Sequence, residues 1–193
     1  APFSKPNFSQ GESMPMFFSS ETAFLRAEGA LRGWNMGGTA QELYEQGVTL
    51  SFTERGVSGV GKYLSDNTST PEDYTSPVES SRLSYQVQTE ITVAWEESAP
   101  FEEKLERIIT QKWIANFPLG FEAWSDYRRT GYPEIFPVVD NLSNGVISTS
   151  RQQRRLPFPL KEKQANSENV KAAVSMLGGS DTGATDLWWA KKN

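Results

Sequence analysis

Apolar residues recur along much of this chain at steps of three and four, the spacing that places side chains on one face of an α-helix. In the first such stretch, residues 18–34, the expected apolar face consists of Phe24, Ala27, Leu31 and Trp34. The same periodicity marks four more stretches: residues 39–55, 101–114, 120–130 and 167–177. The pattern therefore predicts a mainly α-helical protein.

Two of these later stretches have apolar faces that can be assigned residue by residue. The face of the second helix is expected to consist of Leu43, Tyr44, Gly47, Val48 and Phe52. The face of the helix at 101–114 is expected to consist of Phe101, Leu105, Ile108, Ile109 and Ile114. Such one-sided faces predict helices that pack against a common core.

Capping signals mark the ends of several helices. Thr39 and Glu42 fit a capping box, in which the Thr39 side chain bonds the Glu42 amide and Glu42 reaches back. Ser20 is the expected N-cap of the first helix. Helix-terminating glycines follow three of the periodic stretches, at Gly56, Gly131 and Gly178. These signals fix where the helices begin and end more closely than periodicity does.

The first two helices are similar in length and joined by a short turn. Small residues stand where the two helices could touch: Ala27, Gly29, Ala30 and Gly47. This arrangement is typical of a helical hairpin of the tetratricopeptide type, and the sequence shows one such unit.

The remainder of the chain is less regular. A short helix is expected around Lys62-Tyr63-Leu64, a loop at 66–77, and a short strand or extended segment at 85–95. Prolines make residues 131–166 extended. We expect a single region over residues 1–193 with four parts: a helix pair at 18–56, a loop-rich insert at 57–99, helices at 100–130, and a Pro-rich loop with a C-terminal helix at 131–193.

Composition narrows the possible chemistry. The 193 residues can bury a core as one domain or as a piece of a larger one. With no Cys and no His, the chain has no disulfides, thiol catalysis, His-based triads or usual zinc sites. The net charge of −5 disfavours a nucleic-acid partner. Because the sequence starts at Ala1 without an initiator Met, we expect a processed or trimmed chain, or a fragment.

The local motifs favour structural over catalytic roles. Residues 56–63, GVSGVGKY, nearly match a phosphate-binding loop, but Tyr63 replaces the Ser or Thr that would bind magnesium. The carboxylates Glu96-Glu97 and Glu102-Glu103 could suggest a glycosidase, yet the second pair suits the first turn of a helix. The basic segment 151–163 is interpreted as a tied-down loop. We therefore predict no catalytic residues, no metal and no cofactor.

The stretch GFEAWSDYRRTGYP, residues 120–133, joins aromatic and basic side chains. Helical spacing places Phe117, Phe121, Trp124 and Arg128 on one stripe, so that Arg128 can lie over the Trp124 indole. Two interpretations stay open: a structural latch, which we favour, and a contact with ligand.

Several separated blocks of the sequence, in this order, resemble the SusD/RagB family of nutrient-binding outer-membrane lipoproteins. They are SSETAFLRAEGALRGW, GGTAQELYEQGV, ITQKWIANFPLGFEAWSDYRRTGYPEIFPVV, RRLPFPLKEKQANSENV and LGGSDTGATDLWWAKKN. The resemblance spans about Phe18 to Asn193. It implies a fold of tetratricopeptide-like helix pairs with long loops.

The resemblance also implies a function. Members of this family are not enzymes; they bind oligosaccharides or other nutrients at the cell surface as the lid of a TonB-dependent (SusC-like) transporter. They are anchored by a lipid on an N-terminal Cys, which this chain lacks, and they are more than twice as long. The chain is thus expected to be a C-terminal portion. The matched blocks shape the scaffold, so they identify no sugar-binding residue.

Ligand contacts are expected in the irregular insert at residues 57–99, where Tyr63, Tyr74 and Tyr85 lie away from strongly periodic helix faces. Aromatic rings of this kind can stack on sugars. The alternative is a tetratricopeptide-like scaffold that binds a protein or peptide and no glycan.

Overall fold

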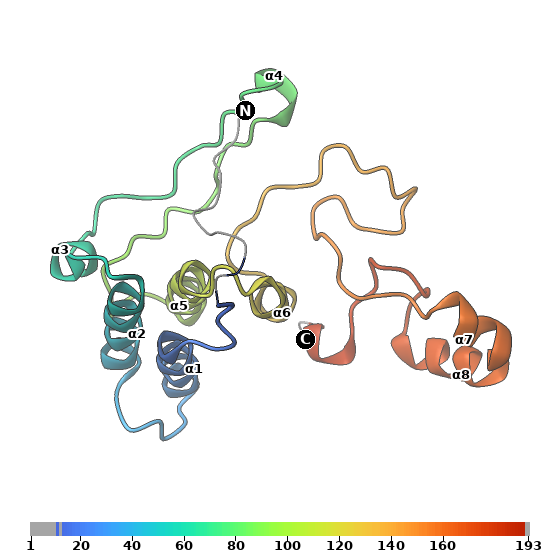
Figure 1. Ribbon diagram of the computed structural model, residues 1–193, viewed down its shortest axis with the longest axis horizontal. Helices are drawn as coiled ribbons and strands as arrows, with labels where there is room; N and C mark the ends of the chain where they lie inside the picture. Colours follow the sequence, from blue (N-terminus) through green and yellow to red (C-terminus); the bar gives the residue numbers. More distant parts are fainter. Residues whose placement is uncertain (1–10, 12, 192–193) are drawn as a thin grey trace. The chain divides into compact units, whose positions relative to one another are not determined.

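The computed structural model describes residue 11 and residues 13–191. It divides into two compact units. Unit 1 contains the residues up to Tyr127 together with Gly131–Glu134, and unit 2 contains Arg128–Thr130 and the residues from Ile135 onward. Figure 1 shows that both units are built from helices and long connecting segments. Among the described residues, β pairing is limited to two isolated bridges, Tyr74 with Tyr85 and Ser148 with Gln152.

The helical hairpin predicted from the sequence forms the centre of unit 1. Helix α1 spans Ser19–Leu31 and helix α2 spans Ala40–Arg55, and the two pack along each other. Gly47 makes the close contact possible, because a Cβ atom at this position would lie 2.8 Å from the Phe24 ring. Absence of a side chain thus sets the distance between the two helices.

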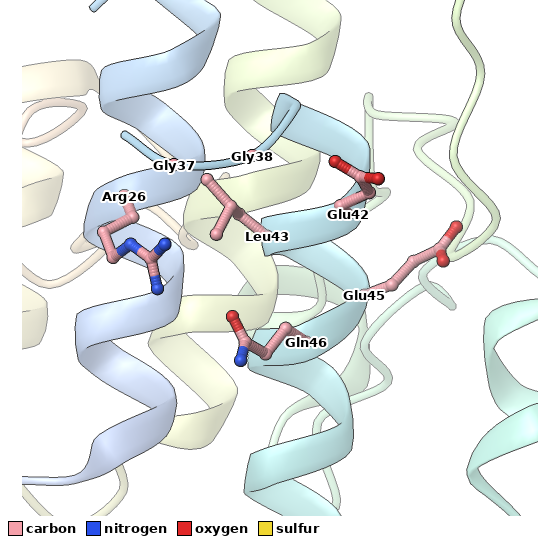
Figure 2. Close-up of a pocket in the computed structure, with 7 residues that line it drawn as sticks. All are labelled: Arg26, Gly37, Gly38, Glu42, Leu43, Glu45 and Gln46. Atoms are coloured by element: carbon pink, nitrogen blue, oxygen red, sulfur yellow. The ribbon is translucent and has the colours of Figure 1, made fainter. Parts of the chain in front are cut away.

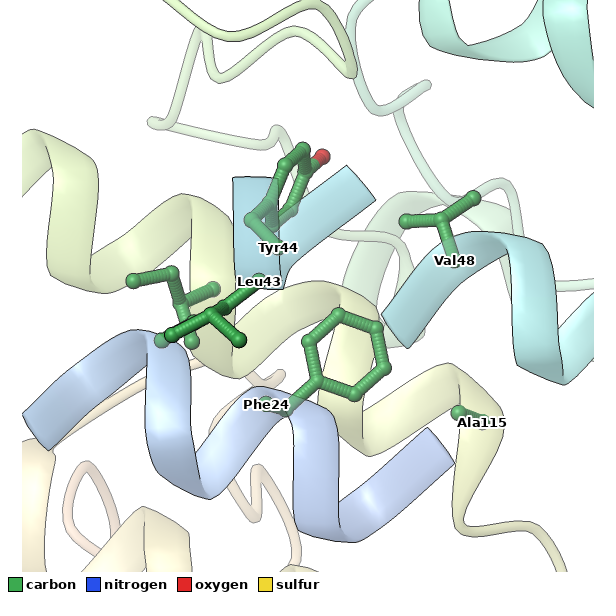
Figure 3. Close-up of a cluster of buried hydrophobic side chains, with 7 residues drawn as sticks. Phe24, Leu43, Tyr44, Val48 and Ala115 are labelled. Carbon is green, nitrogen blue, oxygen red and sulfur yellow. The ribbon is translucent and has the colours of Figure 1, made fainter. Parts of the chain in front are cut away.

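Helix α5, Phe101–Ala115, packs against the hairpin and completes the core. Figure 3 shows the side chains that meet between the three helices. The buried cluster consists of Phe24, Ala27, Leu43, Tyr44, Val48, Ile108 and Ala115. The Tyr44 hydroxyl donates a 2.6 Å hydrogen bond to the Val93 carbonyl, and its ring lies 5.4 Å from the ring of Trp95. The core therefore also holds residues 93–95 in place.

Unit 1 contains three further helical segments. Helix α3 is Val60–Leu64, helix α4 is Ser80–Leu83, and helix α6, Gly120–Thr130, continues into unit 2 at its last residues. The predicted capping box of α2 is present, with reciprocal bonds between Thr39 and Glu42. The expected glycine stop of α6 is present too, since Gly131 adopts a left-handed conformation with φ 87°.

A buried charge network lies within unit 1. The Lys112 ammonium is 2.7 Å from an Asp126 carboxylate oxygen and 3.4 Å from a Glu21 oxygen, and all three side chains are buried. A charge removed from water needs such partners, because losing one leaves another uncompensated. The network joins α1, α5 and α6 through specific side chains in addition to apolar contacts.

Unit 2 contains helices α7, Leu160–Ala165, and α8, Ser167–Leu177, followed by a short 3₁₀ segment η1, Trp188–Ala190. Figure 1 shows α7 and α8 side by side. The basic segment 151–163 is held by two carboxylates near the C-terminus. Arg155 and Lys163 pair with Asp181 at 2.6 and 2.7 Å. Arg154 pairs with Asp186 at 2.8 Å. This confirms the interpretation of a tied-down loop.

Two predictions about α1 are wrong. Phe18, not Ser20, is the N-cap, and the Ser20 hydroxyl instead donates a 2.6 Å bond to Glu54 of α2. The helix ends at Leu31, because Gly33 takes a left-handed φ of 82° and the Trp34 amide bonds back to the Gly29 carbonyl. This is a Schellman ending, which takes Trp34 off the helix and leaves its side chain 63% exposed.

Two other predictions need correction. Phe101 and Ile114 of α5 are exposed, whereas Leu105, Ile108 and Ile109 are buried. Ile114 is six residues beyond Ile108 and so points well away from the buried stripe of a 3.6-residue helix. The Pro-rich stretch at 131–166 was expected to be extended throughout, but it ends in helix α7. Pro159 is the N-cap of α7, a place where proline is compatible with the helix that follows.

Candidate functional site

The loop-rich insert forms a projecting arm, which we define as residues 66–94. Figure 1 shows the arm running out from α3 to α4 and back toward α5. At its base, the Ala94 amide donates a 2.8 Å bond to the Asp66 carbonyl. The Asp66 carboxylate accepts bonds from the Thr68 and Ser69 amides, and these hydrogen bonds hold its pKa below the ordinary value. The arm thus starts from a defined turn.

Tyr74 and Tyr85 face each other across the arm. Their amides and carbonyls exchange two bonds of 2.9 Å, which form the isolated bridge between the outgoing and returning segments. The Tyr85 hydroxyl also donates a 2.6 Å bond to Glu134. That bond is the main reason why the pKa of Tyr85 is raised. Two of the three predicted ligand contacts are therefore brought together by the fold.

Glu134 organises the returning half of the arm. Besides Tyr85, its carboxylate accepts bonds from the Gln88 amide at 3.0 Å and the Thr89 amide at 2.7 Å. Together with the bridge at Tyr85 and the bond from the Val87 amide to Asp73, these contacts hold residues 85–89 in place outside any named strand. The sequence favoured a short strand or an extended segment at residues 85–95; the structure has no strand there and has bends at residues 93 and 94.

Tyr63 is apart from the other two tyrosines. It lies on α3, its hydroxyl donates a 3.0 Å bond to Gln111 of α5, and its ring is 5.2 Å from the ring of Phe52. The side chain packs against the hydrophobic core. These contacts give Tyr63 a role in seating α3 on α2 and α5.

A second candidate is an open pocket of about 560 Å³ beside the α1–α2 turn. Its lining residues are Arg26, Gly37, Gly38, Glu42, Leu43, Glu45 and Gln46. Figure 2 shows Arg26 of α1 facing Leu43 and Gln46 of α2, while Glu42 and Glu45 extend along the outer side of α2. Sequence analysis missed this pocket, because it assigned residues 35–38 only as a turn. The signal available was the pair Gly37-Gly38 beside polar helix positions.

The carboxylates considered for catalysis have structural partners. Glu97 accepts bonds from the Trp95 indole at 2.7 Å and from Lys104 at 3.2 Å. Glu102 and Glu103 lie in the first turn of α5, as predicted. Within the described residues, no cluster of three Asp, Glu, His or Cys side chains has an arrangement that could hold a metal ion.

The predicted latch is partly visible in unit 2. The Arg128 guanidinium lies over the ring of Trp189, 4.9 Å from its centroid, and donates a 3.1 Å bond to the Arg154 carbonyl. Arg154 in turn donates to the Arg128 carbonyl. Burial lowers the pKa of Arg128. The stacking of Arg128 on Trp124 stays a prediction, but an indole from the C-terminal segment does receive this guanidinium.

Known proteins resemble this chain in sequence and in fold. A family model described as SusD-like, the SusD and RagB outer-membrane lipoproteins, matches residues 1–190. The chain belongs to the SusD-like family. A search among curated proteins gave no match. Among the described residues of this SusD-like chain, no helix has the length and apolar character needed to cross a membrane.

Solved structures agree with the family assignment. A chitin-binding SusD homologue from Flavobacterium johnsoniae is 55% identical, with a TM-score of 0.83; the match covers 90% of this chain and 36% of that protein. A SusD-like protein from Bacteroides thetaiotaomicron is 51% identical, with a TM-score of 0.86 over 93% of this chain and 38% of that one. A SusD homologue from Bacteroides uniformis is 52% identical, with a TM-score of 0.84; the match covers 90% of this chain and 36% of that protein.

Two conclusions follow for the SusD-like chain. The predicted fold class is confirmed, since the mainly helical architecture with a tetratricopeptide-like hairpin is shared with these structures. The chain spans little more than a third of the length of the relatives it matches. What the whole relatives bind and assemble with therefore reaches this chain only as a proposal.

Proposed function

We propose that this chain works in the non-catalytic binding of glycans or other nutrients at the outer membrane. The observation that carries the proposal is its 55% identity, over 90% of its residues, to a chitin-binding SusD homologue. Membership in a family of outer-membrane lipoproteins supports the location at the cell surface. A lipid anchor would then attach the complete protein to the membrane.

The proposed mechanism is stacking of sugar C–H faces on aromatic rings, with polar side chains setting the orientation of hydroxyl groups. Of the three tyrosines, Tyr74 and Tyr85 are better placed for this role than Tyr63. They lie on the arm, away from the core, and each ring is carried by a backbone fixed by paired hydrogen bonds. Tyr63 has its hydroxyl and one ring contact directed to the core.

We further propose that the complete protein acts as the lid of a TonB-dependent, SusC-like transporter and delivers the bound nutrient to it. The α1–α2 hairpin supports an alternative, because tetratricopeptide-like hairpins present surfaces for protein or peptide partners. In that case the chain is a scaffold that contacts the transporter and binds no glycan itself.

The test is calorimetric titration of the chain with chito-, malto- and cello-oligosaccharides. We expect binding to at least one series, and a loss of about tenfold or more in affinity for Tyr74→Ala and Tyr85→Ala. Tyr85→Phe is the matched control: it removes the bond to Glu134 but keeps the ring, so stacking should survive.

The outcomes separate the alternatives. Absence of binding to any oligosaccharide, together with retained association with the transporter, would favour the scaffold. Release of sugar from any of these substrates would contradict the assignment as a non-enzyme. Equal affinity of the parent chain and both alanine variants would show that Tyr74 and Tyr85 do not contact the ligand. The proposed function would then still stand.

A further inference from the structure

Beside the open pocket, the α1–α2 turn lies close to helix α1. The Arg26 guanidinium donates to the Met36 carbonyl from Nε at 3.0 Å and from Nη2 at 2.7 Å. Gly29 accommodates the Met36 side chain, since a Cβ atom there would lie 2.7 Å from its sulfur. The turn is therefore held against α1 beside the open pocket.

The charges around the pocket disfavour an ionic ligand. The lining contains one guanidinium, Arg26, and two carboxylates, Glu42 and Glu45, so it is close to neutral and slightly acidic as a whole. An anion would meet two carboxylates, and a cation would meet a guanidinium. Glu42 is also committed to the capping box, where hydrogen bonds from Thr39 lower its pKa and keep it ionised.

The available groups suit an uncharged ligand rich in hydroxyl groups. Gln46 supplies both a donor and an acceptor, Glu45 supplies acceptors, and Arg26 keeps donors beyond those used by Met36. Leu43 adds a small apolar surface between them. At Gly37 a Cβ atom would lie 3.2 Å from the Arg26 guanidinium, and at Gly38 it would lie 3.3 Å from Leu43, so the lack of side chains lets these two lining residues lie against the turn. The volume of about 560 Å³ is in the range of small-ligand sites.

An exposed indole, that of Trp34, lies three residues before Gly37 of the pocket lining. The Trp34 ring rests against α1 at Gly29, where a Cβ atom would be 3.3 Å from its Cε3 atom, and the side chain is 63% exposed. Gly29 is three residues after Arg26, so the two positions are neighbours on one face of α1. The indole thus has a helix behind it and solvent in front of it. A rigid aromatic surface of this kind suits the C–H face of a sugar ring.

We propose that this pocket, together with the exposed Trp34 of the α1–α2 turn, is a subsite for one or two residues of an uncharged oligosaccharide. The proposal deepens the proposed function and rests on it. Trp34 supplies stacking, and Arg26 and Gln46 supply hydrogen bonds to hydroxyl or amide groups of the sugar. The subsite is separate in sequence from the arm that carries Tyr74 and Tyr85.

The test compares matched variants of the full chain by calorimetric titration with N-acetylated chito-oligosaccharides. Trp34→Ala and Gln46→Ala are each expected to weaken binding, Trp34→Ala by about tenfold. Trp188→Ala is the control for the first, because that indole is also exposed but lies in unit 2. Gln164→Ala is the control for the second, because Gln164 is an exposed helical glutamine of α7, in unit 2. Both controls should retain parental affinity.

A second measurement guards against misfolding and separates the two proposals. Thermal melts of Trp34→Ala and Gln46→Ala should match the parent chain, since both side chains are exposed. Unchanged affinity in both variants would overturn the subsite and leave the proposed function standing. Absence of binding by the parent chain to chito-, malto- and cello-oligosaccharides alike would overturn both.

Discussion

Single residues with no side chain determine how the hairpin of unit 1 packs. At Gly47 a Cβ atom would fall 2.8 Å from Phe24, which is itself 1% exposed and has no room to retreat. At Gly61 of α3 a Cβ atom would meet nothing within 4 Å. The two glycines are chemically identical and differ only in what surrounds them.

This difference gives a paired prediction. Gly47→Ala should destabilise the fold by about 1–3 kcal/mol, because the added methyl group overpacks a buried contact. Gly61→Ala should be neutral or stabilise by about 0.5–1 kcal/mol, because alanine favours helix and fills open space. Urea unfolding followed by circular dichroism measures both. Equal effects of the two changes would contradict the packing argument.

A carboxylate in unit 2 gives a prediction about pH. Burial opposes the ionisation of Asp181, but hydrogen bonds from Lys163, Arg155 and the Phe158 amide outweigh it and lower its pKa to about 2. The pKa of an unfolded Asp is near 3.9. Stability from this group is therefore fully present above about pH 4 and is lost as the pH falls toward 2.

Asp181→Asn should remove that contribution. We expect the variant to be less stable than the parent chain at pH 6 and the difference to shrink between about pH 4 and pH 2. Melting curves of both proteins at several pH values provide the measurement. A stability difference that stays constant over this range would show that the ionised carboxylate is not the source.

At the scale of elements, helix α2 is positioned by a local signal at its start and by tertiary contacts near its end. Its start is set locally by the capping box of Thr39 and Glu42. Near its other end, Glu54 accepts bonds from the Ser19 and Ser20 hydroxyls at 2.5 and 2.6 Å, which joins it to the start of α1. These hydrogen bonds lower the pKa of Glu54 against the opposing effect of burial.

The cap is open to a direct test. Thr39→Ala should cost about 1 kcal/mol of stability, because it leaves an amide of the first turn without its side-chain acceptor. Thr53→Ala is a control in the last turns of the same helix, where the hydroxyl only bonds back to the Thr49 carbonyl. That change should be close to neutral. Chemical denaturation of both variants provides the measurement, and a larger loss for Thr53→Ala would contradict the assignment of the cap.

The conformation of the arm could not be predicted from the pattern of its own residues. Alternation along residues 85–95 was compatible with a strand, but a strand needs a neighbour with which to form a ladder. Here the pairing stops at the single bridge between Tyr74 and Tyr85. The Val87 amide donates to the Asp73 side chain, and Glu134 accepts from the Gln88 and Thr89 amides. Glu134 is 46 residues from Gln88 and 45 residues from Thr89, so no local pattern could identify it as the acceptor for these amides.

At the scale of the whole molecule, the C-terminal segment is held by charge as much as by apolar burial. Arg154 and Arg155 are both buried, and each pairs with a carboxylate from residues 181–186. Arg128 adds its contact with Trp189. Unit 2 therefore depends on pairs in which the loss of one partner leaves a poorly solvated charge.

Arg128→Ala should consequently act on the fold rather than on ligand binding. We expect the melting temperature to fall by about 3–6 °C, while the affinity for oligosaccharide changes little. Lys161→Ala, which removes an exposed cation from the same unit, should leave both unchanged. Thermal melts paired with binding titrations give the answer. Unchanged melting with lost affinity would instead make Arg128 a ligand contact.

Local sequence determined the helices themselves. Hydrophobic periodicity, the Thr39 capping box and the glycine stops depend on interactions within a few residues, and these are encoded locally. They predicted the hairpin, α5, α6 and α8, and the blocks of family resemblance predicted the SusD-like fold. The ending of α1 was missed although its signal, Gly33, was present in the sequence.

Tertiary structure alone decided which side chains are available to a ligand. Like Tyr74 and Tyr85, Tyr63 lies in the irregular insert away from strongly periodic helix faces. Its hydroxyl nevertheless bonds Gln111, and its ring packs against Phe52. Trp34 was expected on the apolar face of a helix but is exposed, and two helices and their turn form an open pocket. Exposure and pocket shape result from contacts between residues distant in sequence, and for that physical reason only the folded chain could decide them.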